Sequence, residues 1–436
     1  MRSHCTRLQS VSTVAVAVLT LAVGTRAAAQ ASPGRDSLSA RVRDSLIAAV
    51  LADTNDLELD SLSRLPSAAA IRQTVTFRPT YRRYGVGGVD AAEQSSYASW
   101  SARFRRASIR IDMTPVSYAG DTSLITGRPQ VSFGGASPVS ARLDLQLLRA
   151  DTLRLFAQSA SFPGTLSQID AQALGAVGTS TIDLDAGALG IAARIGLRYA
   201  HTQSIGDDGV ALSFRGGVEY DPRPSGANVV SWRGTTVRGG IGINRTITSG
   251  TLGASMELTK SFADSLGGRN LFPGGGSLMF DARAIRFVGT DGTGFISVNG
   301  FYSKPIDIQR ADQPTRLIPI GDFLGITATG AFPVGALTLL PMVSVMRESS
   351  SASAVVNRVT TGLNASGQTA SVSLGLAVPL GRFITVAPEV GGAFGSVGQT
   401  VTSTFPRRFG RPITRAQSFS DPIRGGWVAL EVSIAR

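Results

Sequence analysis

The sequence contains very little cysteine or histidine. Cys5 is the one cysteine among 436 residues, and His4 and His201 are the only histidines. Because Cys5 lies before an apolar segment near the N-terminus, we expect a mature chain without thiols or disulfides. A histidine-dependent mechanism would have to use His201, and no His/Cys/carboxylate cluster predicts a metal site. We therefore expect no enzymatic activity, no metal and no cofactor.

Long apolar runs are also missing. The run Val14–Val23 follows Arg2 and Arg7 and is too short for a transmembrane helix, which needs about 20 apolar residues. A basic start, a short apolar core and small residues after it are typical of a secretory signal peptide. We expect cleavage after Ala29, with cleavage after Ala31 as the alternative.

Lysine is nearly absent, although the chain is strongly basic. Lys260 and Lys304 are the only lysines, so arginine supplies almost all of the positive charge behind the formal net charge of +12. A nucleic-acid-binding protein can be this basic, but no basic cluster on a helix and no aromatic platform accompanies the charge here. We expect no nucleic-acid partner.

From residue 71 onward, side chains alternate between apolar and polar. Consecutive side chains of a strand point to opposite faces, so this period of two predicts β-strands with one apolar face. The pattern is seen in the apolar series Ile71, Val75, Phe77, Pro79, Tyr81; Ala141, Leu143, Leu145, Leu147; Ile191, Ala193, Ile195, Leu197, Tyr199; and Val428, Leu430, Val432, Ile434. A soluble β-sandwich also alternates in this way.

The connections between the expected strands alternate between short and long. Short turns are expected at 105–107, 150–151, 206–209, 248–250, 290–292, 333–335 and 379–381. Longer polar or Gly/Pro-rich loops are expected at about 84–96, 120–137, 163–188, 221–229, 264–276, 304–321, 348–368 and 398–424. This rhythm predicts an antiparallel transmembrane β-barrel of about 16 strands, within a range of roughly 14 to 18, with both termini in the periplasm.

In these features the chain resembles Gram-negative outer-membrane β-barrels of the porin-like kind. The resemblance covers the signal, the alternating strands and the rhythm of turns and loops, and no motif identifies a subfamily. It implies residues 1–29 as signal peptide, 30–70 as a periplasmic leader and 71–436 as the barrel, located in the cell outer membrane. Lipids, lipopolysaccharide and small solutes are the implied partners, and a homo-oligomer is compatible with this architecture.

Two segments are expected to form short helices. Leu38, Val42, Leu46 and Val50 are four residues apart, which predicts an amphipathic helix over Asp36–Leu51. This helix is either part of a loose periplasmic leader or a segment that folds back into the barrel mouth. Ser167 and Asp170 resemble a capping pair and predict a helix in the loop after Phe162, which would either narrow the lumen or cover the rim.

If the apolar face meets lipid, eleven arginines fall on the lumenal face, among scattered acids. These arginines are Arg72, Arg78, Arg82, Arg103, Arg110, Arg142, Arg154, Arg194, Arg198, Arg215 and Arg238, and the acids are Asp112, Asp144, Glu219, Glu257, Glu389 and Glu431. Guanidinium groups stay charged and bind carboxylate or phosphate in a bidentate manner. The arginines would either attract anions or pair with the acids and stabilise the interior.

Two surface features complete the candidate sites. The last long loop carries four arginines, which either bind anions at the outer surface or are simply solvated: Arg407, Arg408, Arg411 and Arg415. His201 precedes Asp207 and Asp208, but no serine nucleophile motif accompanies this pair, so we do not expect catalysis.

The sequence thus predicts an outer-membrane channel or uptake protein for passive passage of small, preferentially anionic, solutes. The alternative is a non-transporting barrel whose loops bind a partner or surface.

Overall fold

The computed structural model describes the strands and many of their connections. The described residues are 72–86, 89–104, 106–113, 115–120, 131–136, 139–148, 150–160, 192–206, 209–220, 235–262, 264–266, 269–272, 275–289, 294–306, 320–356, 359–406 and 412–436. The expected signal peptide and the expected helices over Asp36–Leu51 and after Phe162 lie outside these residues. Within the described ranges, no helix is long and apolar enough to cross a membrane.

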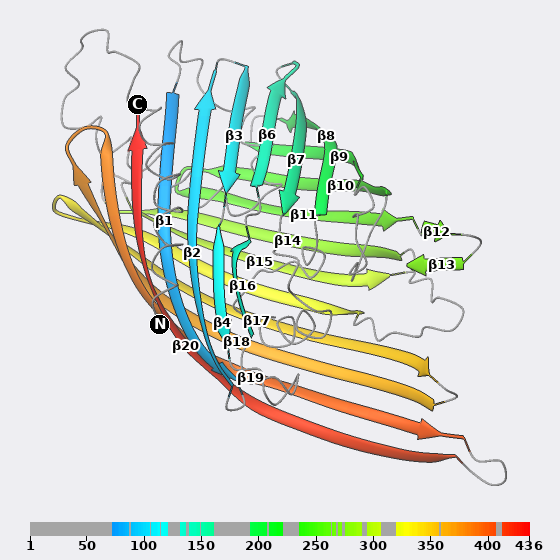
Figure 1. Cartoon of the computed structure of the whole chain (residues 1–436). Helices are drawn as coiled ribbons and strands as arrows, with labels where there is room; N and C mark the ends of the chain where they lie inside the picture. Colours follow the sequence, from blue (N-terminus) through cyan, green and yellow to red (C-terminus); the bar gives the residue numbers. More distant parts are fainter. Residues whose placement is uncertain are drawn as a thin grey trace.

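One continuous antiparallel sheet contains 18 strand elements (Figure 1). They are β1 (Arg72–Val86), β2 (Val89–Arg103), β3 (Ala107–Met113), β4 (Val116–Gly120), β5 (Val131–Ala136), β6 (Val139–Gln146), β7 (Asp151–Ala160), β8 (Ala192–Ile205), β9 (Val210–Tyr220), β10 (Thr235–Ile247), β11 (Gly250–Ser261), β14 (Gly275–Val288), β15 (Gly294–Ile306), β16 (Ile320–Val334), β17 (Leu337–Val356), β18 (Val359–Leu380), β19 (Ile384–Phe405) and β20 (Ile413–Ala435). A separate small hairpin joins β12 (Asp264–Leu266) and β13 (Arg269–Phe272).

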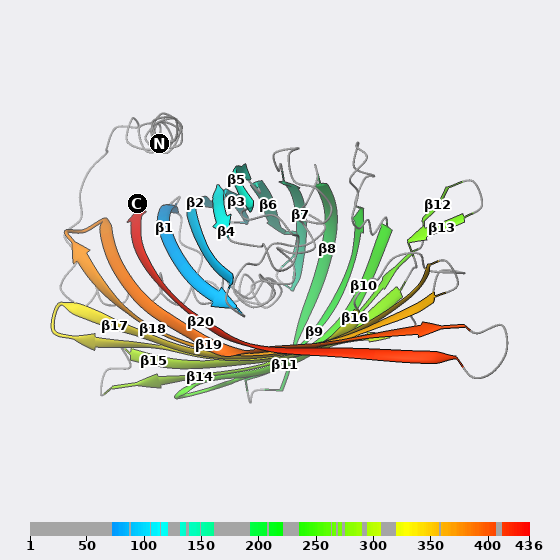
Figure 2. The ribbon, with the colours of Figure 1, turned by 60° about the horizontal axis from the view of Figure 1, so that its bottom comes forward.

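The sheet closes into a barrel of 16 strands. β3 and β4 lie end to end against β2, and β6 and β5 lie end to end against them, so these four elements make two barrel strands. Every strand pairs with its neighbour in sequence, and β20 pairs with β1 to complete the ring. The two strands lie side by side in Figures 1 and 2. The predicted antiparallel barrel and its strand number are confirmed.

Short turns gather at one end of the barrel. Glycines with positive φ stand in these turns, at Gly206, Gly209, Gly289, Gly335 and Gly381, where a residue with a Cβ would be strained. The start of β1 and the C-terminus lie at the same end. The backbones of Gln73 and Arg436 exchange hydrogen bonds of 2.9 and 2.8 Å, and the Ala435 amide donates to the Phe383 carbonyl beside the turn at Gly381 at 2.9 Å. Outer-membrane barrels place their short turns in the periplasm, so we expect this end to be the periplasmic one.

Three of the expected long loops are strands instead. The segment 84–96 continues β1 and β2, which pair up to Val86 and Val89. The segments 348–368 and 398–424 largely continue β17 to β20, which are 20 to 23 residues long. Their Ser, Thr and Gly content resembles that of loops, but the strands stay paired in register, so backbone hydrogen bonds hold them extended.

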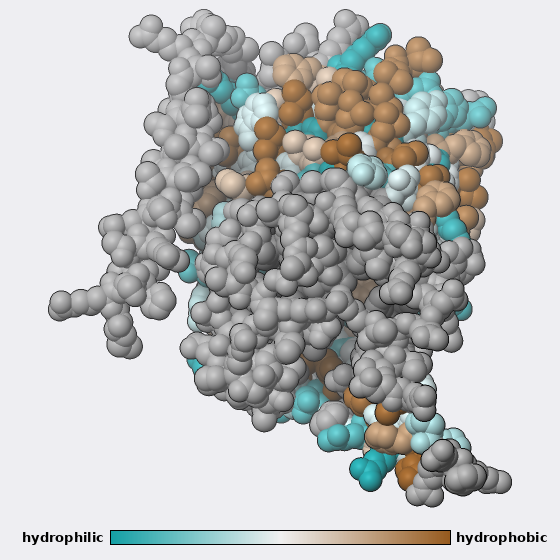
Figure 3. Space-filling model, turned by 45° about the vertical axis from the view of Figure 1, so that its right-hand side comes forward, coloured by the Kyte–Doolittle hydropathy of each residue, from teal (hydrophilic) through white to brown (hydrophobic). Residues whose placement is uncertain are grey.

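The distribution of hydrophobicity is the reverse of that in a soluble protein. Large apolar side chains are exposed, with Val390 at 60%, Val428 at 55% and Ile241 at 51%, whereas Ser297, Glu219 and Arg154 are at most 3% exposed. Figure 3 shows apolar residues gathered over part of the surface, with hydrophilic residues around them. A closed barrel leaves no unpaired strand edge, and an apolar exterior suits lipid. The protein is therefore a transmembrane β-barrel of the bacterial outer membrane.

The outer limit of the apolar exterior can be located on β17 to β19. Val345, Ala370 and Phe394 lie opposite one another on the outward face, and the next outward row is Arg347, Gln368 and Ser396. The strands continue beyond this polar row for about nine residues, which corresponds to about 30 Å. Figures 1 and 2 show β19 and β20 reaching well past β1. We call this part of β17 to β20 the outer extension, comprising residues 347–356, 359–368, 396–405 and 413–422.

Candidate functional site: the inner face of the barrel

The inner face of the barrel carries the polar side chains that alternate with the exposed apolar ones. On β8, for example, Arg194 and Arg198 alternate with Ile195, Leu197 and Tyr199, which are 39 to 55% exposed. On this strand the two predicted arginines are thus on the opposite face from the exposed apolar residues.

Asp144 on β6 binds two arginines from the inner face. Its carboxylate lies 2.6 Å from Nε of Arg154 on β7 and 3.1 Å from Nε of Arg142 on its own strand. The side chains of Asp144 and Arg154 are 1% and 3% exposed. A charge this deeply buried is stable only when it is paired and hydrogen-bonded, so Asp144 ties β6 to β7.

A longer network begins at Glu219 on β9. Its carboxylate lies 2.6 Å from Arg198 of β8 and 2.8 Å from Arg238 of β10. Arg238 also lies 2.8 Å from Glu257 of β11. The guanidinium of Arg198 stands 5.2 Å from the ring centre of Phe156, in a cation–π arrangement. The network thus links five adjacent strands, β7 to β11.

The seam between the first and last strands carries a third cluster. Arg78 of β1 donates to the Glu389 carboxylate of β19, and the indole of Trp427 on β20 donates to the same carboxylate at 3.0 Å. Gly391 leaves room for this indole, because a Cβ there would lie 2.1 Å from the ring. Farther along β1, Arg82 lies 3.4 Å from Glu93 of β2.

Arg110 on β3 completes the set of predicted arginines with identified acidic partners. It donates to Asp112 at 2.9 Å and to the hydroxyl of Tyr97 at 2.6 Å, and Tyr97 in turn donates to Asp112 at 2.6 Å. Five of the six acids noted in the sequence, all except Glu431, therefore contact arginines. These contacts are expected if the arginines stabilise the inner face of the barrel by pairing with the acids.

The remaining predicted arginines are placed less fully. Arg103, Arg194 and Arg215 all have interaction partners in the structure; one contact of Arg215 is to Ser213 at 3.5 Å. Arg72 is the first residue of β1. Of the four basic residues expected in the last outer loop, Arg415 lies exposed on β20, opposite Ser403 of β19. Arg407, Arg408 and Arg411 lie outside the described residues.

The inner face of β15 to β18 differs in chemistry from the rest. Among the described residues it presents hydroxyl and amide groups together with the buried Phe295 and the stacked rings of Phe301 and Phe323, and none of the ion pairs named above. We call this part the hydroxyl wall and define it by Ser297, Asn299, Thr327, Thr329, Ser344, Thr369, Ser371 and Ser373. We call the inner face of β1 to β14 the charged wall. The sequence pattern did not reveal this division, because it depends on which strands are neighbours.

Arg283 on β14 stands where the two walls meet, and it was missed at the level of sequence. Its side chain alternates with those of Ala282 and Ala284, whose small size gives a weak apolar pattern. Arg283 is 9% exposed, and no hydrogen bond or ion pair to its guanidinium is found among the described residues.

His201 does not form a site with its neighbours in sequence. Its Nδ1 lies 2.9 Å from the carboxylate of Asp151, which also accepts a hydrogen bond from Tyr199. The three residues lie near the periplasmic end of β7 and β8, on the face that carries exposed Tyr199. Asp207 and Asp208 lie outside the described residues. In the parts of the chain that are described, no three His, Cys, Asp or Glu side chains are grouped as a metal site would need.

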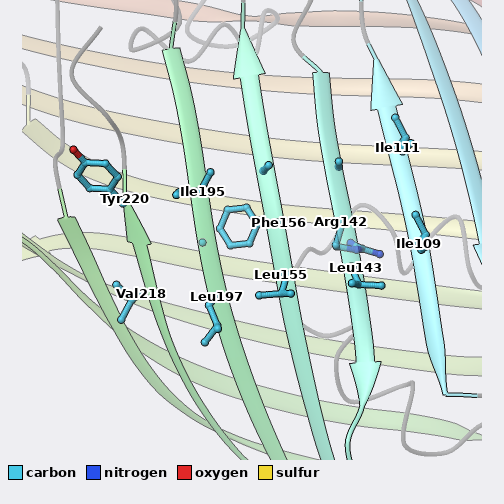
Figure 4. A pocket seen from close by; sticks show the side chains of 13 residues that line it. Ile109, Ile111, Arg142, Leu143, Leu155, Phe156, Ile195, Leu197, Val218 and Tyr220 are labelled. Carbon is cyan, nitrogen blue, oxygen red and sulfur yellow. The ribbon is translucent and has the colours of Figure 1, made fainter.

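A hollow of about 660 Å³ lies on the outward face of β3 and β6 to β9 (Figure 4). Its lining includes the small residues Ala141 and Ala157, and Figure 4 shows Ile109, Leu155 and Ile195 on neighbouring strands around it. These residues are exposed apolar residues, or they lie on the same face of their strand as the exposed apolar residues. The hollow therefore faces lipid.

Comparisons with known proteins found similar chains among solved structures. No family model and no curated protein matches the chain. Among solved structures, Pseudomonas putida OprB is 9% identical with a TM-score of 0.44, covering 84% of this chain and 94% of that one. In-vitro folded OmpT of Vibrio cholerae is 11% identical with a TM-score of 0.39, covering 85% and 99%. The anion-selective porin from Comamonas acidovorans is 11% identical with a TM-score of 0.37, covering 85% and 100%. Likeness at this level concerns overall fold and says nothing about the solute.

Proposed function

We propose that this barrel is a passive channel for small polar solutes, with a moderate preference for anions. The observation that carries the proposal is the closed ring of 16 strands with a polar inner face. Barrels of 16 to 18 strands are wide enough to enclose an aqueous channel. A polar lining suits water and hydrated solutes, whereas a barrel filled with an apolar core would not conduct.

The preference for anions is moderate because most predicted lumenal arginines have partners. Paired charges such as Arg154 and Asp144 create little net field at a distance. Arg283 is the exception, since its charge lacks a partner among the described groups. The selectivity then arises from few positions rather than from the whole ladder of arginines.

Planar-bilayer recording tests this proposal directly. The mature protein, refolded in detergent, should give stepwise conductance increases, and a salt gradient should give a reversal potential on the anion-selective side. Correctly folded protein without channel events would overturn the proposal, and a cation-selective reversal potential would overturn the preference for anions.

A second candidate is a non-transporting barrel that binds a partner or surface from outside. Two observations favour it: Ser213 and Ser297 on the inner face are at most 1% exposed, and the outer extension presents a polar sheet above the membrane. In this case the folded protein would not conduct, and removal of the outer extension would abolish adhesion to the partner surface.

A further inference from the structure

The outward face of the outer extension is polar but carries almost no charge. Its residues alternate along β17 to β20 in phase with the exposed apolar residues below them. We call it the neutral face and define it by its described polar side chains other than Arg347: Ser349, Ser351, Thr360, Asn364, Ser366, Gln368, Ser396, Thr400, Thr402, Thr404, Thr414, Ser418 and Ser420. The extension also contains Glu348, Arg415 and Asp421, but these three lie on the opposite face of the sheet.

The composition of the neutral face suits neither lipid nor a protein partner. A lipid-facing surface is apolar, as the exterior is below the row of Arg347, Gln368 and Ser396. Protein interfaces are centred on large side chains such as Trp, Tyr and Arg, which the neutral face lacks at its described positions. Surfaces that meet only water usually carry charges of both signs. The face therefore fits a partner rich in uncharged hydrogen-bonding groups.

The hydroxyl groups of the neutral face form a regular array. The Thr400 hydroxyl lies 3.1 Å from that of Ser418, and the Thr404 hydroxyl lies 3.2 Å from that of Thr414. Neighbouring positions are about 4.8 Å apart between strands and about 6.7 Å apart along a strand. Each hydroxyl can both donate and accept hydrogen bonds, as the hydroxyls of a sugar do, so a sugar chain can bond to several positions in succession.

Two exposed arginines lie at the base of the neutral face. Arg347 lies in the first polar row, and Arg424 of β20 lies opposite Phe394 in the last apolar row. Guanidinium groups bind phosphate in a bidentate manner, and basic residues beside a membrane are attracted to anionic lipid groups. Away from the membrane, the outward surface thus changes from apolar to basic and then to neutral and polar.

We propose that this surface binds a phosphorylated glycolipid of the outer leaflet. The acyl chains lie on the apolar exterior of β17 to β20, the phosphate groups bind Arg347 and Arg424, and the sugar chain lies along the neutral face. Tail, phosphate and sugar follow one another in such a lipid in the same order as the three zones of the surface. The neutral face also continues directly from the surface that meets the membrane. This interaction does not depend on whether the barrel conducts.

Native mass spectrometry of the full mature chain in detergent tests the surface with two probes. One is lipopolysaccharide that retains its core oligosaccharide, and the other is lipid A, which has the same acyl chains and phosphates without the core. We expect the core-bearing probe to bind about tenfold more tightly, because its sugars add hydrogen bonds to the neutral face. Equal affinity for the two probes, or no binding of either, would overturn the proposal.

A double variant tests the neutral face itself. Thr400→Val with Ser418→Ala removes two facing hydroxyls, so we expect binding of the core-bearing probe to weaken about fivefold while binding of lipid A is unchanged. The matched control is Thr361→Val with Ser403→Ala, which removes one threonine and one serine hydroxyl from a facing pair on the opposite side of the same sheet. Equal loss in both double variants would contradict binding at the neutral face.

The arginines at the base need a separate test. Arg347→Gln with Arg424→Gln should weaken binding of both probes about tenfold, because both carry the phosphates. The control is Arg245→Gln with Arg286→Gln, which removes the same charge from exposed outward positions near the periplasmic end of β10 and β14. If the control loses as much affinity, the phosphate contact is not at Arg347 and Arg424. Heat-dependent mobility on gels shows that each variant is folded.

Discussion

Asp144 is the residue on which the β6–β7 wall depends most. It lies between Arg142 and Arg154 and is almost fully buried. We predict that Asp144→Asn destabilises the barrel by about 3 kcal/mol, because breaking a buried ion pair leaves uncompensated charge. The measurement is the urea unfolding midpoint in lipid vesicles.

The control for this change is Glu431→Gln. Glu431 accepts a hydrogen bond of 3.1 Å from Ser433, which glutamine can also accept. The free energy of unfolding should therefore change by less than about 0.5 kcal/mol. A similar loss of unfolding free energy in both variants would show that the Asp144 cluster has no special role in stability.

Glu219 offers a test of charge in the lumen. Glu219→Gln removes the shared partner of Arg198 and Arg238 and leaves the wall more positive. One unit charge contributes about 0.4 kcal/mol at 10 Å in water, so we expect the anion-to-cation permeability ratio to rise roughly twofold. Reversal potentials in a salt gradient provide the measurement.

The matched control is Asp322→Asn. Asp322 lies in outward phase on β16 and accepts a hydrogen bond of 3.0 Å from Tyr302. The loss of its charge should leave the permeability ratio unchanged. If Glu219→Gln has no larger effect than this control, ions do not pass the Glu219 network.

Sequence alternation predicts which arginines face inward, but it does not predict their partners. Arg78 and Glu389 are 311 residues apart and meet only because the barrel closes between β20 and β1. Arg283 was missed for a different reason: the alanines on either side give no clear apolar face. Pairing depends on register between strands, and a single sequence carries little information about register.

At the scale of strands, the outward face of β17 is apolar within the membrane and polar in the outer extension. Val343 lies within the apolar exterior, 46% exposed, whereas Ser351 lies on the same face in the outer extension. We predict that Val343→Arg costs about 2 to 4 kcal/mol, as arginine does near the middle of a bilayer.

Ser351→Arg is the control on the same strand. Its guanidinium would be in water, so the unfolding midpoint in vesicles should match that of the native protein. Equal destabilisation by both changes would mean that the membrane boundary is not at the row of Arg347, Gln368 and Ser396.

The outer extension should be dispensable for the barrel. We predict that replacing residues 352–363 by an Asn-Gly turn, which closes the hairpin at the Ser351–Asn364 pair, leaves folding and insertion intact. The strand segments removed lie beyond the apolar exterior, so no lipid contact is lost. Folding into vesicles, followed by gel mobility, provides the measurement.

A shortening within the membrane should have the opposite result. Removing 344–347 together with 368–371 deletes four paired positions and shortens the apolar exterior below a spanning length. Successful insertion of this variant would contradict our placement of the membrane.

The existence of most strands could be predicted from the sequence, and so could six of the seven short turns, whereas the turn expected at 290–292 lies outside the described residues. Strand length could not be predicted. The rhythm of turns gave the number of strands because a transmembrane barrel needs strands of nearly constant length. The outer extension is not subject to that constraint. Its Ser-, Thr- and Gly-rich strands are held by pairs such as Thr400–Ser418 and Thr404–Thr414, and their composition alone predicts loops.

At the scale of the whole molecule, the closed ring and its apolar exterior determine how the protein should behave in solution. We predict that the mature chain partitions into the outer-membrane fraction and requires detergent for extraction. The folded protein should resist SDS until it is heated, because every barrel strand is paired on both sides. Differential extraction and gel mobility before and after boiling are the measurements; recovery in the aqueous fraction without detergent would contradict a transmembrane barrel.

The seam between β1 and β20 has a consequence for the order of folding. The hydroxyl groups of Thr76 and Ser433 meet at 3.2 Å although 357 positions separate them in the chain. Hairpins between neighbouring strands form early because their loops are short, whereas ends this distant lose much more entropy when they meet. We therefore expect a curled sheet with two free edges to precede the barrel. On this argument, closure of the seam between β1 and β20 is the last step that converts the sheet into a barrel.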